Sequence, residues 1–265
     1  NARSLTVTVN PNFTEVEADI ARQSINNSFV VFKPEKRDFF RDATEYYSTL
    51  LPMVYTRNIV KPEIGASFLR TGTTNSTGVF WVRDEVTNVT MPDTFGSDTV
   101  ELDVANTSAA FRHQYSKNKK TIGLLATFRS GDDGYHNAVA GVDGLINLGV
   151  DDKLRYQVMY SDTKYPQSFA EDLCENSGCT QSPPPTPTTP CLIGDCDTNA
   201  QVLRTDYGQP LTDHGLRLSY KHDGPESLFW ANYINVGPDF RADLGFARKV
   251  DIRAVNFAYG RNWYL

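Results

Sequence analysis

Residues 119–129 (KKTIGLLATFR) and residues 135–148 (YHNAVAGVDGLINL) decide the fold of this chain. In the first stretch, apolar side chains occupy every second position from 122 to 128, and Leu125 is the one apolar residue that breaks the pattern. In the second stretch, Ala140, Val142 and Ile146 alternate with polar or small residues. A period of two is the spacing of side chains that share one face of a β-strand. The two stretches therefore predict two amphipathic strands.

The same alternation recurs along most of the chain. The further predicted strands lie at 5–9, 64–70, 77–86, 107–115, 154–161, 216–221, 228–236 and 255–261. Residues 14–56 alternate poorly and are interrupted by Pro34 and Pro52, so we expect irregular structure there, with a helical turn near 38–48. About ten to twelve strands can be counted in this way, and the predicted fold class is all-β and antiparallel.

Strand length and turn pattern favour a transmembrane β-barrel over a soluble all-β domain. Runs such as 137–149 and 251–263 exceed the roughly 5–6 residues of a typical soluble strand and reach the roughly 9–11 that cross a bilayer at a tilt. Short polar turns, as at 116–120, contrast with one long connection at about 163–213, and barrels place short turns and long loops on opposite sides of the membrane. A soluble sandwich with aromatic residues in its core stays as the alternative.

Composition excludes two classes of protein. The 265 residues include 26 Lys and Arg against 32 Asp and Glu, which gives a net charge of −6 and leaves no basic stripe for a nucleic-acid partner. The chain also has no apolar run of the roughly 18 residues that a transmembrane helix needs, so a helical membrane protein is excluded as well.

The four cysteines lie in the long connection as two close pairs, Cys174 with Cys179 and Cys191 with Cys196. Structural zinc sites favour two-residue spacings between cysteines, and no histidine lies near these pairs. We therefore expect disulfides formed in an oxidising compartment, with three pairings open.

Several phrases resemble a bacterial family often labelled DUF5916. They are Asn10-Pro11-Asn12-Phe13 with Val16-Glu17-Ala18-Asp19, Pro34-Glu35-Lys36-Arg37 with Phe39-Phe40, and Pro238-Asp239-Phe240 with Gly245-Phe246. The chain departs from the family pattern at Asn12, where Asp is usual, and at Asp38, where Pro is common.

The resemblance implies architecture and location more than chemistry. In the family, a domain similar to family 9 carbohydrate-binding modules precedes an outer-membrane β-barrel that continues beyond the part matched here. We therefore expect this chain to form part of a larger barrel in the outer membrane of a Gram-negative bacterium. The family implies no defined activity.

A barrel needs a polar inner wall opposite its apolar lipid face. Polar strand residues predicted to line the lumen are Arg112, Gln114, Arg129, Asp143, Asn147, Arg155, Gln157, Arg217, Lys221, Arg253 and Arg261. Because arginines are frequent among them, a lumen that selects or holds anions is one interpretation, and a structural lattice of Arg–carboxylate pairs is the other.

The segment over 14–56 carries a cluster of charges that forms either a plug against the inner wall or a solvated periplasmic linker. The candidate residues are Glu17, Asp19, Glu35, Lys36 and Arg37. Burial in a narrow lumen would require each charge to be paired, and Glu35 with Arg37 is the pair we expect.

Sequence motifs for catalysis are absent. The four histidines lie in separate segments, neither HExxH nor G-x-S-x-G occurs, and nothing in the spacing favours a carboxylate pair for glycoside hydrolysis, so we expect no catalytic residues. Asp132 and Asp133 lie in a Ser-Gly-Asp-Asp-Gly loop that calcium could use, but the spacing of an EF-hand is missing and turn chemistry is favoured. No other cofactor or metal is expected.

The sequence thus predicts two parts: residues 1–56, a strand and a charged segment, and residues 57–265, the barrel strands with the cysteine-bearing loop outside the cell. The predicted function is a porin-like conduit or a docking sheath for a solute or protein partner. A carbohydrate-binding or glycan-processing surface protein is the first alternative, and a soluble all-β binding domain is the second. The expected partners are outer-membrane lipid, with a protein subunit or glycans left open.

Overall fold

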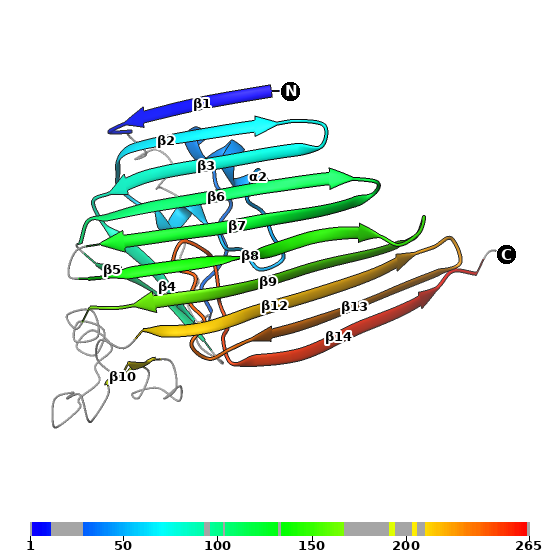
Figure 1. Ribbon diagram of the computed structural model, residues 1–265. Helices are drawn as coiled ribbons and strands as arrows, with labels where there is room; N and C mark the ends of the chain where they lie inside the picture. The colour runs from blue at the N-terminus through cyan, green and yellow to red at the C-terminus, as the bar shows by residue number, and fades with distance from the viewer. Residues whose placement is uncertain are drawn as a thin grey trace.

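A computed structural model describes residues 2–11, 29–92, 96–102, 104–131, 134–166, 191–193, 203–205 and 210–263. Its main feature is one antiparallel sheet of ten strands in the order β1-β2-β3-β6-β7-β8-β9-β12-β13-β14 (Figure 1). The strands are β1 (Ala2–Val9), β2 (Pro62–Thr71), β3 (Asn75–Asp84), β6 (Asn106–Lys117), β7 (Lys120–Gly131), β8 (His136–Asn147), β9 (Asp152–Lys164), β12 (Leu211–Asp223), β13 (Ser227–Val236) and β14 (Ile252–Arg261).

The predicted all-β, antiparallel fold is confirmed, and every predicted strand region overlaps a strand of the main sheet, although the region 77–86 extends past the end of β3 at Asp84. The described residues also form two small hairpins, β4 (Thr87–Pro92) with β5 (Ser97–Leu102) and β10 (Cys191–Ile193) with β11 (Leu203–Thr205). Helix α2 (Asp38–Tyr46) lies where the helical turn was expected, and a single 3-10 turn, η2, spans Thr56–Asn58.

Connections of very different length join the strands at the two ends of the sheet. At one end, named the hairpin end, residues 72–74, 118–119, 148–151 and 224–226 make tight turns. Asn118 and Lys119 have φ values of 51° and 62°, as a two-residue type I′ turn requires. The turn between β6 and β7 is therefore two residues long, shorter than the predicted turn at 116–120. The opposite end, named the loop end, carries the long connections, among them residues 10–61, 165–210 and 237–251.

Register defines the two faces of the sheet, because paired residues on neighbouring strands point to the same side. One row across the sheet consists of Ser4, Leu69, Gly78, Arg112, Leu125, Gly141, Met159, Gly215, Val236 and Ile252. We call this side the inner face and the opposite side the outer face. Leu125, which breaks the alternation of its strand, is buried on the inner face.

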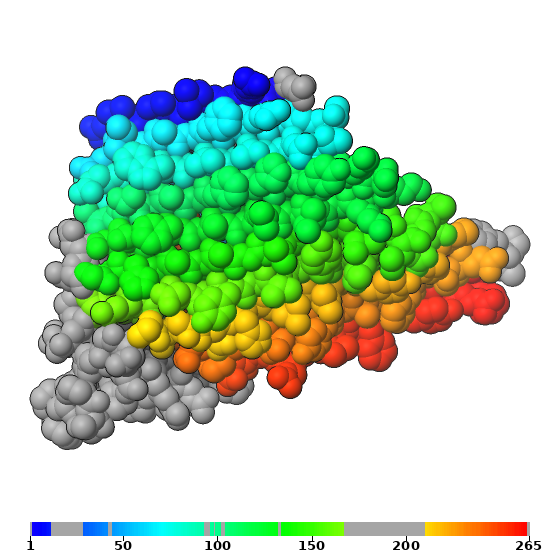
Figure 2. Space-filling view, in the orientation of Figure 1, coloured from blue at the N-terminus to red at the C-terminus, as the bar shows by residue number. Residues whose placement is uncertain are grey.

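Two connections from the loop end fold back over the inner face, and we call them the inner segments: residues 29–61, which include α2, and residues 237–251. Figure 1 shows α2 behind the sheet, whereas Figure 2 shows the outer face, formed by the strands themselves. Phe40, Met53 and Leu244 of the inner segments pack with inner-face residues such as Phe80 and Met159 into one hydrophobic core. The sheet therefore obtains its core from these segments and not from a second sheet.

The predicted boundary near residue 56 does not separate two units of the sheet. β1 pairs with β2 over eight residues, from Ala2 opposite Thr71 to Val9 opposite Ile64. In the described part of the chain, the outer edges of β1 and β14 have no strand partner, so the sheet is open.

Candidate functional site

The outer face carries a continuous band of exposed apolar side chains. Phe257, Leu124 and Phe128 expose 71%, 51% and 46% of their surface. Other exposed members of the band are Leu5, Val7, Phe68, Val79, Trp81, Phe111, Ile122, Val158, Leu218 and Val255. They come from strands across the whole width of the sheet, from β1 to β14. Soluble monomers rarely expose an apolar surface of this extent.

Polar residues border the band at both ends of the strands. At the hairpin end of the outer face lie Arg3, Arg70, Lys117, Lys120, Asp152, His222 and Arg261, and at the loop end lie Arg83, Ser130, His136, Lys164, His214 and Arg253. On β7 the polar borders Lys120 and Ser130 lie ten residue steps apart, with the apolar residues of the band between them. At about 3.3 Å per residue and the tilt of about 40° that outer-membrane barrels have, the two borders would lie about 25 Å apart, which suits the apolar band of such barrels.

Arg253 and Arg261 lie on this outer face, which corrects their assignment to the lumen. Arg253 pairs with Asn235 and Arg261 pairs with Ser227. Both lie an even number of residues from Val255, Phe257 and Tyr259 on the same strand, and side chains at even spacing point to the same face. They lie at the two ends of β14, where a long cationic side chain can reach past an apolar band to water.

The other nine predicted lumen residues share the inner face. In the loop half of that face, several of them bind backbone groups of the inner segments. The fully buried Arg129 donates from Nη2 to the carbonyl of Asn58 (3.0 Å) and from Nη1 to that of Asp243 (3.2 Å). Gln157 accepts a hydrogen bond from the amide of Leu51 (2.6 Å) and donates to its carbonyl (3.1 Å). These side chains hold the inner segments on the wall.

Arg217 and the pair Arg112–Asp143 lie beside these contacts. Arg217 donates from Nη1 to the carbonyl of Leu50 at 2.7 Å, and Arg112 Nη2 lies 2.6 Å from Asp143 Oδ2. Gly123 lies opposite Asp143, and a Cβ added to it would lie 2.8 Å from Asp143 Oδ1. The glycine thus provides the space in which the carboxylate meets Arg112.

Asp243 is the buried acid at the centre of the second inner segment. Its carboxylate accepts hydrogen bonds from the hydroxyls of Tyr135 (2.7 Å) and Tyr165 (2.8 Å), and its amide donates to Asn137 Oδ1 (3.1 Å). Burial raises the pKa of Asp243, although the two hydroxyls and the nearby Arg129 and Arg241 favour its charged form. In the sequence, Pro238-Asp239-Phe240 and Gly245-Phe246 stand out only as family phrases, and nothing local predicts this cluster because its partners are distant in sequence.

Glu35 and Arg37 are paired, as the sequence predicts, and their other hydrogen bonds join two parts of the first inner segment. Arg37 Nη2 is 2.7 Å from Glu35 Oε2, and Arg37 also donates to the carbonyls of Ile59 and Thr56, both at 2.6 Å. Burial acts to raise the pKa of Glu35, but the hydrogen bonds and charge of Arg37 outweigh it and hold that pKa below its usual range. The neighbouring Lys36 is exposed.

The hairpin half of the inner face is polar, and part of it is open to solvent. Three cationic residues lie there on β9 and β12, Lys153, Arg155 and Lys221, and Arg217 lies next to them at the middle of β12, opposite Gln157. Lys153 pairs directly with Lys221 across the two strands, and Lys153, Arg155 and Lys221 are exposed. Nearby, Gln114 is half-buried and Asn147 donates to the carbonyl of Lys119.

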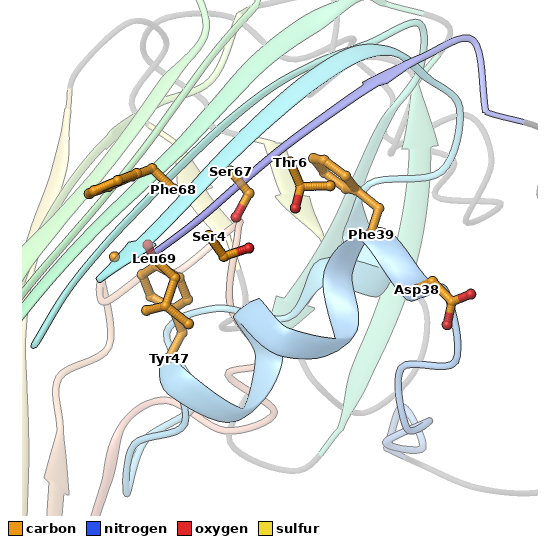
Figure 3. Close-up of a pocket in the computed structure, with 9 residues that line it drawn as sticks. Ser4, Thr6, Asp38, Phe39, Tyr47, Ser67, Phe68 and Leu69 are labelled. Carbon is orange, nitrogen blue, oxygen red and sulfur yellow. The ribbon is translucent and has the colours of Figure 1, made fainter. Parts of the chain in front are cut away.

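A small pocket lies at the β1 edge of the inner face, between the sheet and α2 (Figure 3). Hydroxyl-bearing residues of β1 and β2 meet aromatic residues of the helix segment there: Ser4, Thr6, Ser67, Phe39 and Tyr47. Asp38 lies at its rim, where it pairs with Arg41 at 2.9 Å. The pocket holds no carboxylate pair.

Some predicted site residues fall outside the described residues. These are Glu17, Asp19, Asp132, Asp133, Cys174, Cys179 and Cys196, so the predicted disulfides and the calcium loop are not placed. Cys191 begins β10. Within the ranges described, no group of three or more His, Cys, Asp or Glu could hold a metal ion. No helix in those ranges is both long and apolar enough to cross a membrane.

No protein-family model matches the sequence, and no curated protein matches it. Among solved structures, the chain is similar to outer-membrane expressed OmpT of Vibrio cholerae, with 12% identity and a TM-score of 0.39 over 77% of this chain and 56% of that chain. It is also similar to the loop L8 deletion mutant of the same protein, with 10% identity and a TM-score of 0.38 over 68% of this chain and 50% of that chain. In both matches the chain spans about half the length of the other chain.

Proposed function

We propose that this chain forms part of the wall of a bacterial outer-membrane β-barrel and that the barrel is a solute conduit narrowed by the inner segments. The observation that carries the proposal is the outer face: an exposed apolar band between two polar borders that lie about 25 Å apart. Lipid acyl chains are the occupant that fits, because the band extends from β1 to β14 and its centre carries no Lys, Arg, Asp or Glu side chain.

Protein contact explains the outer face less well. A second sheet or a helix would cover a patch of limited width, whereas this band runs from Leu5 on β1 to Phe257 on β14.

In a membrane, both edge strands of the sheet would also lie in lipid, where unpaired backbone groups are costly. We therefore infer that β1 and β14 pair with further strands in the membrane and that the complete barrel is larger than this sheet.

The inner face supports a conduit that is constricted in one half. In the loop half, the wall holds the inner segments through buried side chains, those of Arg129, Gln157 and Asn137. The hairpin half carries exposed, charged side chains instead, as Arg155 and Lys221 show. A polar wall next to a fixed constriction fits a solute pathway better than a sheath whose whole bore is filled.

Tryptophan fluorescence tests the membrane assignment, because Trp81 lies on the outer face and Trp230 on the inner face. In lipid vesicles with brominated acyl chains, we expect strong quenching in a variant that keeps only Trp81 (Trp230→Phe, Trp263→Phe). We expect little quenching in the matched variant that keeps only Trp230 (Trp81→Phe, Trp263→Phe). Equal quenching of the two, or a chain that stays in solution without detergent, would contradict the proposal.

Single-channel recording tests the conduit. Planar bilayers that contain the protein should show discrete conductance steps. Removal of an anchor, as in Gln157→Ala, should increase the size or the noise of the steps because the inner segment loses two hydrogen bonds to the wall. Inserted protein without any conductance would favour the docking sheath.

A further inference from the structure

Four positive charges lie on two neighbouring strands of the inner face, three in its hairpin half and one at the middle of β12. Lys153 and Arg155 on β9 face the same side as Arg217 and Lys221 on β12. Directly opposed like charges destabilise a strand pair, and yet Lys153 lies directly opposite Lys221. We call these four residues the basic wall.

Few acidic groups compensate the basic wall. Lys221 Nζ lies 2.5 Å from Asp223 Oδ2, and the nearby Asp143 is paired with Arg112. In the described part of the chain, the side chains of Lys153 and Arg155 make no hydrogen bond or ion pair. Among the described residues, Asp223 is therefore the one carboxylate that pairs with a member of the basic wall, although the chain as a whole has a net charge of −6.

Folding alone does not account for the arrangement. Arg217 holds the carbonyl of Leu50, which is a structural role, but Lys153, Arg155 and Lys221 contact neither inner segment through a hydrogen bond or ion pair in the described residues. Lys153 and Arg155, which have no hydrogen-bond or ion-pair partner among the described residues, lie with Lys221 on the polar inner face of an acidic chain and create a local positive potential there. Such a potential concentrates anions at the constriction.

We propose that the basic wall binds small multivalent anions, of the oligophosphate or polycarboxylate class, as they enter the conduit from the hairpin end. The inference rests on the proposed function, since the wall faces a solute only if the inner face lines a bore. Two or three adjacent cations favour a solute with several negative charges over a monovalent ion, because each charge of the solute can then meet its own partner. A neutral sugar would gain nothing from the wall.

The chain provides a matched control on its other face. The triple variant Lys153→Gln, Arg155→Gln, Lys221→Gln removes two lysines and one arginine from the inner face. The control variant Lys117→Gln, Lys120→Gln, Arg261→Gln removes the same charges from the outer face at the same end of the strands. Arg217 is left unchanged in both because it also holds Leu50.

Binding of tripolyphosphate, measured by calorimetry in detergent micelles, tests the inference without requiring insertion. We expect the inner variant to bind about tenfold more weakly or worse, the outer variant to stay within about twofold of the unchanged protein, and the affinity to fall with added salt. Equal losses in both variants, or no binding by the unchanged protein, would overturn the inference. Quenching of Trp81 is measured separately from tripolyphosphate binding. Loss of the binding result would therefore leave the membrane assignment standing, whereas an error in the membrane assignment would appear in the quenching experiment.

Discussion

The hydroxyl of Tyr135 lies 2.7 Å from Oδ2 of Asp243, and both residues are buried although 108 positions separate them. Tyr135 belongs to the loop-end connection between β7 and β8, whereas Asp243 lies in the inner segment between β13 and β14. The bond therefore joins the middle of the sheet to a connection near its edge.

Asp243 should make the protein less stable as the pH rises. Burial raises its pKa in the folded protein, so the folded state binds a proton more readily than the unfolded state. The contribution of Asp243 to the free energy of unfolding is then largest below the unfolded pKa, near pH 4, and is lost as the pH rises through the folded pKa. Asp243→Asn should remove this pH dependence in denaturant titrations in micelles. An unchanged difference between the two proteins from pH 4 to pH 8 would contradict the expectation.

Glu35→Ala should destabilise the first inner segment strongly. The change leaves the Arg37 guanidinium buried without its carboxylate, a loss of about 3–5 kcal/mol in unfolding free energy for a buried pair. Asp38→Ala is the control because the Asp38–Arg41 pair is exposed, and exposed pairs contribute about 0–1 kcal/mol. Urea unfolding in micelles compares the two variants. Similar losses would mean that Glu35 does not anchor the segment.

Gly123→Ala should disrupt the Arg112–Asp143 pair. The new Cβ would lie 2.8 Å from Asp143 Oδ1, so the carboxylate must move, and we expect a loss of about 1–3 kcal/mol. Gly260→Ala, also on the inner face, should be tolerated because the nearest atom, Leu228 Cβ, is 3.9 Å from the new Cβ. Thermal unfolding followed by circular dichroism measures both, and equal stability of the two variants would argue against the close fit at Gly123.

Phe257→Arg and Asn256→Arg test the two faces on adjacent positions of β14. Phe257 belongs to the apolar band and Asn256 to the inner face. In lipid, arginine in the band should cost about 2–4 kcal/mol, and arginine on the inner face should cost much less. Reversible unfolding from lipid vesicles measures the difference. If Asn256→Arg proves the more costly variant, the faces have been assigned the wrong way round.

The strands and their two faces could be predicted from the sequence, because alternation is local. Ile122, Leu124 and Phe128 share a face wherever their strand pairs, and the structure places them together in the apolar band. The same rule would have placed Arg253 and Arg261 correctly, since their odd numbers match Phe257. Their charge suggests a place in the lumen, but the face to which a side chain points is set by the two-residue period of the strand and not by its charge.

Other parts of the candidate site depend on contacts between residues far apart in sequence. Nothing local in residues 237–251 shows that Asp243 lies between Tyr135 and Tyr165, or that Arg129 holds the carbonyls of Asn58 and Asp243. The sequence by itself determined the strands, the apolar outer face and the charged pair Glu35–Arg37. Only the tertiary structure decided which connections fold inward and which polar residues hold them, because a buried polar group takes whichever partner the complete fold brings within hydrogen-bond distance.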